Sequence, residues 1–339
     1  MIRFLRATLN PDCYHGFGKK PPFFEGWYYK LVDVNKEHRY AIIPGIFQSA
    51  QPARSHTFVQ VFDGNTGNLT YHQYPLSSFK FAKGIFDIWI GPNHFTAQNL
   101  SLSIESPEQH IKGDLQLSYL TPWPVTLKSP GIMGWYAWAP FMQCYHGVVS
   151  MDHLIEGNLQ INHQSIDFSA GRGYTEKDWG RSFPESWVWF QCNHFAQAGV
   201  SLTASIAIIP WIRGAFPGFI IGLWKRQKLY RFATYTGAQL EELSVNENRI
   251  AVTARDRNYR LEMLVARSSE NGILQAPSID GMDRQINESL DAKVEVCLSA
   301  IEGHHSHVIY QDSGYCAGLE AVGDLEKLMD MWMAEKARV

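Results

Sequence analysis

Residues 171–195 read GRGYTEKDWGRSFPESWVWFQCNHF, and the fold can be inferred first from this stretch. From Trp187 onward the residues alternate with a period of two, which predicts a β-strand. One face of that strand is an ordinary apolar core face, made by Val188, Phe190 and Cys192. The other carries two indoles and two amides, Trp187, Trp189, Gln191 and Asn193. This second face suits a mostly apolar pocket with a few placed polar groups.

Short alternating segments of the same kind recur along the chain. Residues 23–32 place Glu25, Trp27 and Tyr29 on one face, and residues 56–62 do the same for His56, Phe58 and Gln60. Clusters of Gly, Asn, Asp and Pro separate these segments, as between strands of a hairpin. We expect an irregular leader up to Lys20 and one C-terminal helix after a cap at Asp324. The sequence therefore predicts an all-β, antiparallel protein with a C-terminal helix.

Short segments of the chain recur at an offset of about half its length, which suggests a duplication. Glu25-Gly26-Trp27 matches Glu185-Ser186-Trp187 at an offset of 160 residues, and Ile42-Ile43-Pro44 recurs as Ile208-Ile209-Pro210 at nearly the same offset. Two β-domains follow, 1–165 and 166–339, each a barrel or sandwich. Small closed barrels can hold one hydrophobic ligand, as lipocalins do.

Composition excludes several classes of protein. A net charge of −3 argues against sequence-independent nucleic-acid binding, which requires a basic surplus. Five scattered cysteines predict neither a disulfide framework nor a structural zinc site, and favour a reducing compartment. The N-terminus lacks the apolar run of a secretory signal. Val200–Trp224 is broken by Pro and Gly, so it cannot span a bilayer and is predicted to form two strands joined by a turn. We expect a cytoplasmic protein that makes at most transient contact with membrane surfaces. Its oligomeric state is left open.

Three carboxylates are candidate general acids: Glu25, Glu176 and Asp178. A carboxyl group buried among indoles has its charged form disfavoured, so it can stay protonated near neutral pH. The alternative is that each forms a structural ion pair with Arg172, Lys177 or Arg181. Nine further residues are candidates for contact with a ligand: Trp27, Tyr29, His56, Gln60, His146, Lys177, Trp179, Gln191 and Asn193, besides Trp187 and Trp189.

No metal or cofactor is predicted. His304-His305-Ser306-His307 has no acidic partner nearby and is typical of an exposed hairpin. The sequence contains no phosphate-binding glycine loop, nucleophile elbow or dinucleotide fingerprint.

Four motifs resemble the tocopherol cyclase family: FFEGWYYK (23–30), YTEKDWGRSFPESWVWFQCNHF (174–195), LQAPSIDG (274–281) and SGYCAGLEAVG (313–323). This family is similar to carotenoid hydratase-like and Diels–Alderase-like proteins, and the group resembles two lipocalin-like barrels in tandem. The resemblance implies cofactor-free closure of a chromanol ring on a prenylated benzoquinol. An acid would protonate the alkene beside the ring, and the quinol hydroxyl would trap the tertiary cation.

The resemblance does not fix the substrate. The alternative function is a lipocalin-like carrier that binds a prenylated or polycyclic ligand without changing it. A carrier requires the aromatic lining but has no use for a neutral carboxyl group. The position of Glu25, Glu176 and Asp178 relative to lysine and arginine therefore discriminates between the two.

Overall fold

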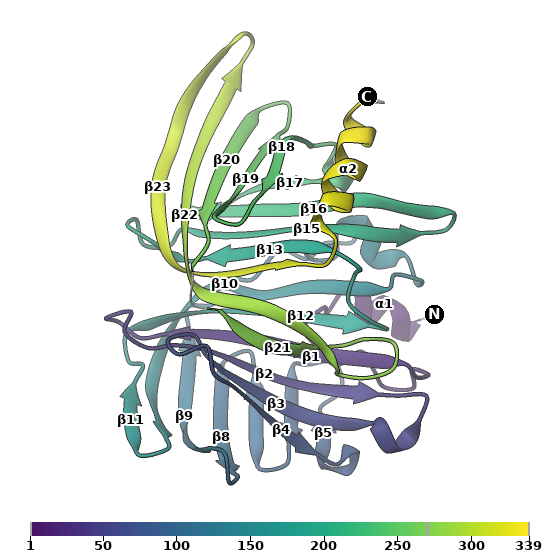
Figure 1. Ribbon diagram of the computed structural model, residues 1–339, viewed down its shortest axis with the longest axis vertical. Coiled ribbons are helices and arrows are strands. Elements are labelled where there is room, and N and C mark those ends of the chain that lie inside the picture. Colours follow the sequence, from purple (N-terminus) through teal and green to yellow (C-terminus); the bar gives the residue numbers. More distant parts are fainter. Residues whose placement is uncertain (1, 269–270, 338–339) are drawn as a thin grey trace. The chain divides into compact units, whose positions relative to one another are not determined.

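The computed structural model describes residues 2–268 and 271–337 (Figure 1). Two compact units are present, Met1–Phe183 with Gly272–Ile286, and Pro184–Asn271 with Asn287–Val339. The expected division between residues 165 and 166 falls inside a short strand, β11 (Gln164–Asp167). As a statement about independently folding domains, that division stays a prediction.

The first unit is built on one antiparallel sheet. Its strands are β1 (Phe23–Val32), β2 (Arg39–Gln48), β3 (His56–Asp63), β4 (Leu69–Tyr74), β5 (Phe79–Phe81), β6 (Asp87–Ile90), β7 (Asn93–Thr96), β8 (Asn99–Glu105), β9 (His110–Ser118), β10 (Cys144–Ile161) and β12 (Gly171–Gly180). Their order is β4-β3-β2-β1-β12-β10-β9-β8-β7-β6-β5, with β11 beside β10. The short strand β21 (Gly272–Ala276) also belongs to this unit.

The second unit repeats this plan. Its strands are β13 (Trp187–Cys192), β14 (His194–Phe195), β15 (Ser201–Trp211), β16 (Gly214–Lys225), β17 (Lys228–Ala233), β18 (Gln239–Val245), β19 (Arg249–Arg255), β20 (Tyr259–Ala266), β22 (Arg284–Glu302, whose first three residues belong to the first unit) and β23 (His305–Val322). Their order is β17-β16-β15-β13-β23-β22-β20-β19-β18, with β14 beside β23. Val200–Trp224 thus forms two strands joined by a turn, as predicted.

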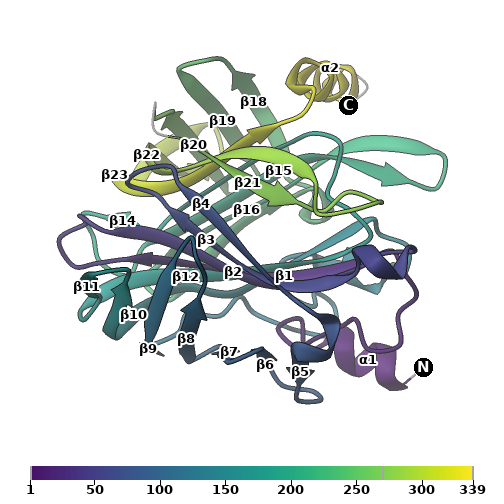
Figure 2. The same cartoon turned by 60° about the horizontal axis from the view of Figure 1, so that its bottom comes forward.

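The shared plan supports the predicted duplication. In each sheet an early strand is central and pairs with a late one, β1 with β12 (Figures 1 and 2) and β13 with β23 (Figure 1). The Ile-Ile-Pro stretches lie on corresponding strands, β2 and β15, but out of register. Tyr29 pairs with Ile42 and Trp189 with Ser205, so the corresponding partner positions are 163 residues apart, whereas the Ile-Ile-Pro stretches are 166 apart.

Each unit has its own core. In the first unit Trp27, Tyr29 and Leu31 of β1 lie in a cluster of buried apolar side chains. In the second unit Val188, Phe190 and Cys192 do so, which confirms the predicted core face of β13. The C-terminal helix α2 (Leu325–Lys336) buries Leu328 in this second core, and the Asp324 side chain caps it by accepting from the Lys327 N–H. Both features confirm the prediction from sequence.

The N-terminal leader was predicted to be irregular, and this was wrong in part. Residues Ile2–Thr8 form a short helix, α1. The irregular prediction does hold for residues 9–22, which the structure leaves without helix or strand. The histidines of 304–307 are exposed around the β22–β23 turn, as expected.

Candidate functional site

The pairing of β1 with β12 divides the predicted site residues between the two faces of one sheet. Glu25 lies opposite Trp179, and Trp27 lies opposite Lys177. Because neighbours along a strand alternate, Glu176 and Asp178 lie on the other face. His146 of β10 lies opposite Asp178 and joins that second face. The predicted candidates therefore form separate clusters.

The first cluster is a buried ion pair. Lys177 Nζ lies 2.5 Å from Glu25 Oε1, and neither side chain is exposed. The ammonium also lies over the rings of Trp27 and Trp179, 4.8 Å and 4.7 Å from their centroids. Indole faces stabilise a desolvated cation in this position. Here the cation that the indoles face belongs to the protein itself.

The N-terminal segment completes the ion pair. The backbone N–H groups of His15 and Gly16 donate to the Glu25 carboxylate at 2.9–3.1 Å, and Lys177 donates to the carbonyl of Cys13. The His15 ring stacks on Trp179, with centroids 4.3 Å apart. Burial alone would raise the pKa of Glu25, but Lys177 and the hydrogen bonds from His15 hold it below its ordinary value. Glu25 is an anion with its bonds filled, which is the structural alternative considered above.

Two further candidates belong to this interior. Tyr29 is fully buried and its hydroxyl donates to the Thr96 carbonyl at 2.7 Å. The Trp27 indole donates to the Asp12 carbonyl at 3.1 Å. Both side chains act as core residues with satisfied polar atoms.

The second cluster occupies the opposite face of β10 and β12. His146 Nδ1 lies 3.0 Å from Asp178 Oδ1, and His146 Nε2 lies 3.6 Å from Glu176 Oε2. The Tyr174 hydroxyl donates to the same Glu176 oxygen at 2.5 Å. The Glu176 side chain is 7% exposed, whereas those of His146 and Asp178 are 13% and 25% exposed. An imidazole thus stands between a buried and a partly solvated carboxyl group.

This cluster could also hold a metal ion. One ligand atom from each of His146, Glu176 and Asp178 lies within 4.8 Å of the others, the one such group found in the described ranges 2–268 and 271–337. However, His146 Nδ1 is already engaged with Asp178, and a Glu176 oxygen accepts from the Tyr174 hydroxyl. The arrangement fits a chain of side chains that share protons through hydrogen bonds better than a set of side chains available to coordinate a metal ion.

On one side of Asp178 the neighbouring strands carry glycines. Gly26 of β1 lies opposite Asp178, and Gly45 of β2 lies opposite Gly26. A Cβ at Gly26 would lie 3.8 Å from the Pro44 carbonyl oxygen and 4.0 Å from Ile43 Cγ2, which are ordinary contacts. At Gly45 it would collide with the Phe58 ring. Two neighbouring positions beside the acidic cluster therefore carry no side chain.

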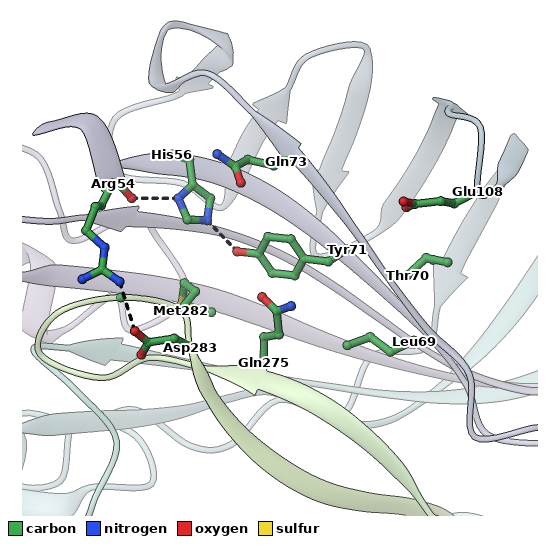
Figure 3. Close-up of a pocket in the computed structure, with 11 residues that line it drawn as sticks. Arg54, His56, Leu69, Thr70, Tyr71, Gln73, Glu108, Gln275, Met282 and Asp283 are labelled. Atoms are coloured by element: carbon green, nitrogen blue, oxygen red, sulfur yellow. Dashed lines mark hydrogen bonds and ion pairs between the residues drawn. The ribbon is translucent and has the colours of Figure 1, made fainter.

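A cavity of about 620 Å³ lies on the same face of the sheet, at β3 and β4 (Figure 3). His56 lines it and accepts from, or donates to, the Tyr71 hydroxyl at 2.6 Å. The Gln60 amide bonds both backbone groups of Gln275, at 2.9 Å and 3.0 Å. Gln60 therefore fixes β21 against β3.

The remaining candidates belong to the second unit. Trp187, Trp189, Gln191 and Asn193 are all buried. The Trp187 indole donates to Glu320 at 2.6 Å, and Glu320 lies opposite both Trp189 of β13 and the fully buried Glu288 of β22. The sequence reasoning missed Glu288 and Glu320. The signal for Glu320 was its place within the motif at 313–323.

Tyr174 and Tyr71 were also missed. Tyr174 could have been found, because it precedes Glu176 by two positions and so shares its face. Tyr71 and His56 come together only through the pairing of β3 with β4, which the sequence does not specify residue by residue.

Comparison with known proteins agrees with the motifs. The profile described as tocopherol cyclase-like matches residues 96–323, about two thirds of the chain. The chain belongs to the tocopherol cyclase-like family. It is 26% identical over 206 residues to a probable chloroplastic tocopherol cyclase of Oryza sativa subsp. japonica, and 24% identical over 207 residues to the chloroplastic tocopherol cyclase of Zea mays. These matches cover 59% of this chain.

Both plant proteins are longer than the shared region. The chain spans 44% of the rice protein and 43% of the maize protein. Among solved structures, CghA is similar over 90% of this chain and 89% of its own, with a TM-score of 0.54 and 10% identity. That likeness shows the fold alone. The predicted class, two tandem lipocalin-like β-domains with a C-terminal helix, is confirmed.

No helix within the described residues is long and apolar enough to cross a membrane. The predicted cytoplasmic location and contacts with membrane surfaces stay predictions.

Proposed function

We propose that the protein is a tocopherol cyclase-like enzyme that closes a chromanol ring on a prenylated benzoquinol, with His146, Glu176 and Asp178 as its acid cluster. Family membership supports the reaction class. The observation that carries the proposal is the imidazole between two carboxyl groups, at 3.0 Å and 3.6 Å. The assignments of substrate and residues are ours.

The reaction needs a proton donor and a proton acceptor in one place. Protonation of the trisubstituted alkene forms a C–H bond and leaves a tertiary cation. The quinol oxygen attacks that cation, a C–O bond forms, and the hydroxyl proton is released. The product has the mass of the substrate, and the proton gained by the enzyme replaces the one it gave.

Glu176 is the member of the cluster best suited to give the proton. It is 5% exposed, and burial disfavours the charged form of a carboxyl group. His146 lies beside it, and Asp178 bonds the other ring nitrogen and fixes the imidazole orientation. His146, whose side chain is partly exposed, can take up a proton from solvent and pass it to Glu176.

Glu25 is not used in this mechanism. Its carboxylate is held by Lys177 and by the backbone N–H groups of His15 and Gly16, so its proton is lost more readily than that of an ordinary glutamate. An ionised, fully bonded carboxylate cannot protonate an alkene. Glu25, the first acid named from the sequence, is therefore reassigned to a structural role.

The test is incubation of the purified full chain with a phytylated benzoquinol under reducing conditions, with the chromanol detected by chromatography. We expect Glu176→Gln to lower kcat by about 10²- to 10⁴-fold, the usual contribution of general acid catalysis. His146→Gln and Asp178→Asn should also lower it. Glu156→Gln, an exposed carboxylate on the same strand as His146, is the matched control and should retain full activity.

The carrier alternative has its own signature. Tryptophan fluorescence that is quenched by the quinol, without any chromanol formed, would replace the enzyme proposal with binding alone. Turnover that survives Glu176→Gln, Asp178→Asn and His146→Gln would remove the acid cluster from the mechanism.

A further inference from the structure

The cavity at β3 and β4 plays no part in the mechanism above. Its volume of about 620 Å³ lies within the range of small-molecule sites. His56, Leu69, Tyr71 and Gln73 come from the strands, and Gln275, Met282 and Asp283 from the segment 275–283 (Figure 3). The motif LQAPSIDG (274–281), which carried part of the family resemblance, supplies Gln275 and Gly281 of this second wall, and Met282 and Asp283 follow it directly.

That wall is held in place before any ligand arrives. The Gln60 amide fixes the Gln275 backbone through two hydrogen bonds. The Ser278 hydroxyl oxygen accepts from the backbone N–H of Gly281 at 3.0 Å, and the hydroxyl donates to Asp283 at 2.8 Å. Asp283 in turn pairs with Arg54 at 3.2 Å. A pre-formed wall lowers the ordering cost of binding.

The polar centre of the cavity is a tyrosine–histidine pair, and the donor and acceptor of its hydrogen bond can be assigned. His56 Nδ1 lies 2.9 Å from the Arg54 carbonyl oxygen, which can only accept, so Nδ1 carries the proton. Burial lowers the pKa of His56, so the ring is neutral and Nε2 is an acceptor. The Tyr71 hydroxyl must therefore donate to Nε2, at 2.6 Å.

The direction of this hydrogen bond determines whether Tyr71 can donate to a ligand or accept from it. Its proton is committed to His56, and burial raises the pKa of Tyr71, so the phenol stays neutral. The oxygen retains lone pairs that accept a hydrogen bond. The cavity thus presents a neutral acceptor. Two of its charged side chains, Arg54 and Asp283, balance one another, and the third, Glu108, is a carboxylate that disfavours an anion. A ligand that brings a neutral donor is therefore favoured over an anion.

The apolar contacts favour a flat ring. The Tyr71 ring stacks on Phe58 at 5.1 Å between centroids, with 22° between the planes. Met282 packs into the same cluster, and Leu69 lines the cavity beside it. A hydroxyl donor attached to an aromatic ring satisfies both the acceptor and these surfaces.

We propose that this cavity binds phenols, with the phenol hydroxyl donating to Tyr71 Oη. The proposal does not depend on ring closure by the acid cluster, because a phenol without a prenyl chain meets every requirement named above. The site belongs entirely to the first unit.

The test compares two ligands that differ in one donor hydrogen, 4-phenylphenol and 4-methoxybiphenyl, by calorimetric titration of the full chain. The wild-type protein should bind the phenol about tenfold or more tightly than the ether, the worth of one buried hydrogen bond. Tyr71→Phe keeps the ring and should abolish this preference. Tyr74→Phe is the matched control on β4 and should leave it intact, because Tyr74 packs with the core on the other face.

A second variant tests the direction of the pair. In His56→Leu the Tyr71 hydroxyl is free to donate, so the ether should gain affinity relative to the phenol. Equal affinity for both ligands in the wild type, or a preference that survives both Tyr71→Phe and His56→Leu, would overturn the proposal. Thermal unfolding of each variant shows that its fold is intact.

Discussion

The Lys177 ammonium lies 2.5 Å from the Glu25 carboxylate, and both side chains are wholly buried between β1, β12 and the N-terminal segment. Two charges removed from water are tolerated because hydrogen bonds and indole faces replace their hydration. This pair therefore stabilises the fold, although Glu25 was a candidate for catalysis and Lys177 a candidate for ligand contact.

Removal of one partner should leave an uncompensated buried charge. We expect Lys177→Met and Glu25→Gln each to lower the free energy of unfolding by about 3–5 kcal/mol, and the double variant to lose less than the two combined. Urea titration measures this. The exposed pair Glu185–Lys327, at 2.8 Å, is the control, and Lys327→Met should cost less than about 1 kcal/mol. Similar losses for the two pairs would contradict the structural role of Glu25.

The glycines beside Asp178 allow a steric test of the acid cluster. Gly26→Ala places its methyl group at ordinary contact distances, so the melting temperature should change little. It fills space next to Asp178, so ring closure should slow. Gly45→Ala meets the Phe58 ring and should cost about 1–3 kcal/mol, the usual price of overpacking. A Gly26→Ala protein with normal turnover would show that the substrate does not pass over the surface at Gly26.

From the hydrogen bonds within the acid cluster, we predict that chromanol formation does not require a metal ion. His146 Nδ1 is engaged by Asp178, and the Tyr174 hydroxyl donates to Glu176. Dialysis against EDTA should therefore leave chromanol formation within about twofold of its starting rate. Activity that disappears with EDTA and returns with Zn²⁺ or Mn²⁺ would assign the three side chains to a metal site instead.

His153 predicts a loss of stability in acid. Burial, with a contribution from Arg172, lowers its pKa from 6.5 to about 3. Between these values the unfolded chain binds a proton that the folded chain does not, so the free energy of unfolding falls as the pH is lowered from 6.5 toward 3. At pH 5 the loss relative to pH 7 from this residue is about 2 kcal/mol.

Replacement of the ring should remove that dependence. His153→Phe should flatten the unfolding free energy between pH 7 and pH 5, measured by urea titration at each pH. His163→Phe, an exposed residue in the turn after β10, should leave the slope unchanged. Equal slopes in the wild type and His153→Phe would show that the residue is solvated in the folded state.

Local periodicity sufficed for much of the fold. Alternation along residues 187–192 predicted the core face of β13, and Asp324 predicted the start of α2. Alternation also separates Lys177 from Glu176 and Asp178 on β12, as the structure shows. These features depend on neighbours within one strand or one helical turn.

The partners of the charged residues could not be predicted in this way. Glu25 meets Lys177 because β1 pairs with a strand 150 residues later, in one particular register. His146 meets Asp178 through another such pairing, and residues 12–16 reach the ion pair through a segment without regular structure. Non-local register depends on the packing of the whole sheet, which a single sequence pattern does not encode.

The central pairing of first and last strands has a topological effect. Phe24 lies opposite Gly180, and Trp187 lies opposite Val322, so each sheet begins and finishes at neighbouring positions. A chain whose two ends meet can be joined to a second copy by a few residues, without rethreading any strand. It can also be opened at a hairpin and rejoined at its old ends. Such a fold is open to tandem fusion and to circular permutation, and the two similar sheets of this protein have the arrangement that a fusion of this kind would leave behind.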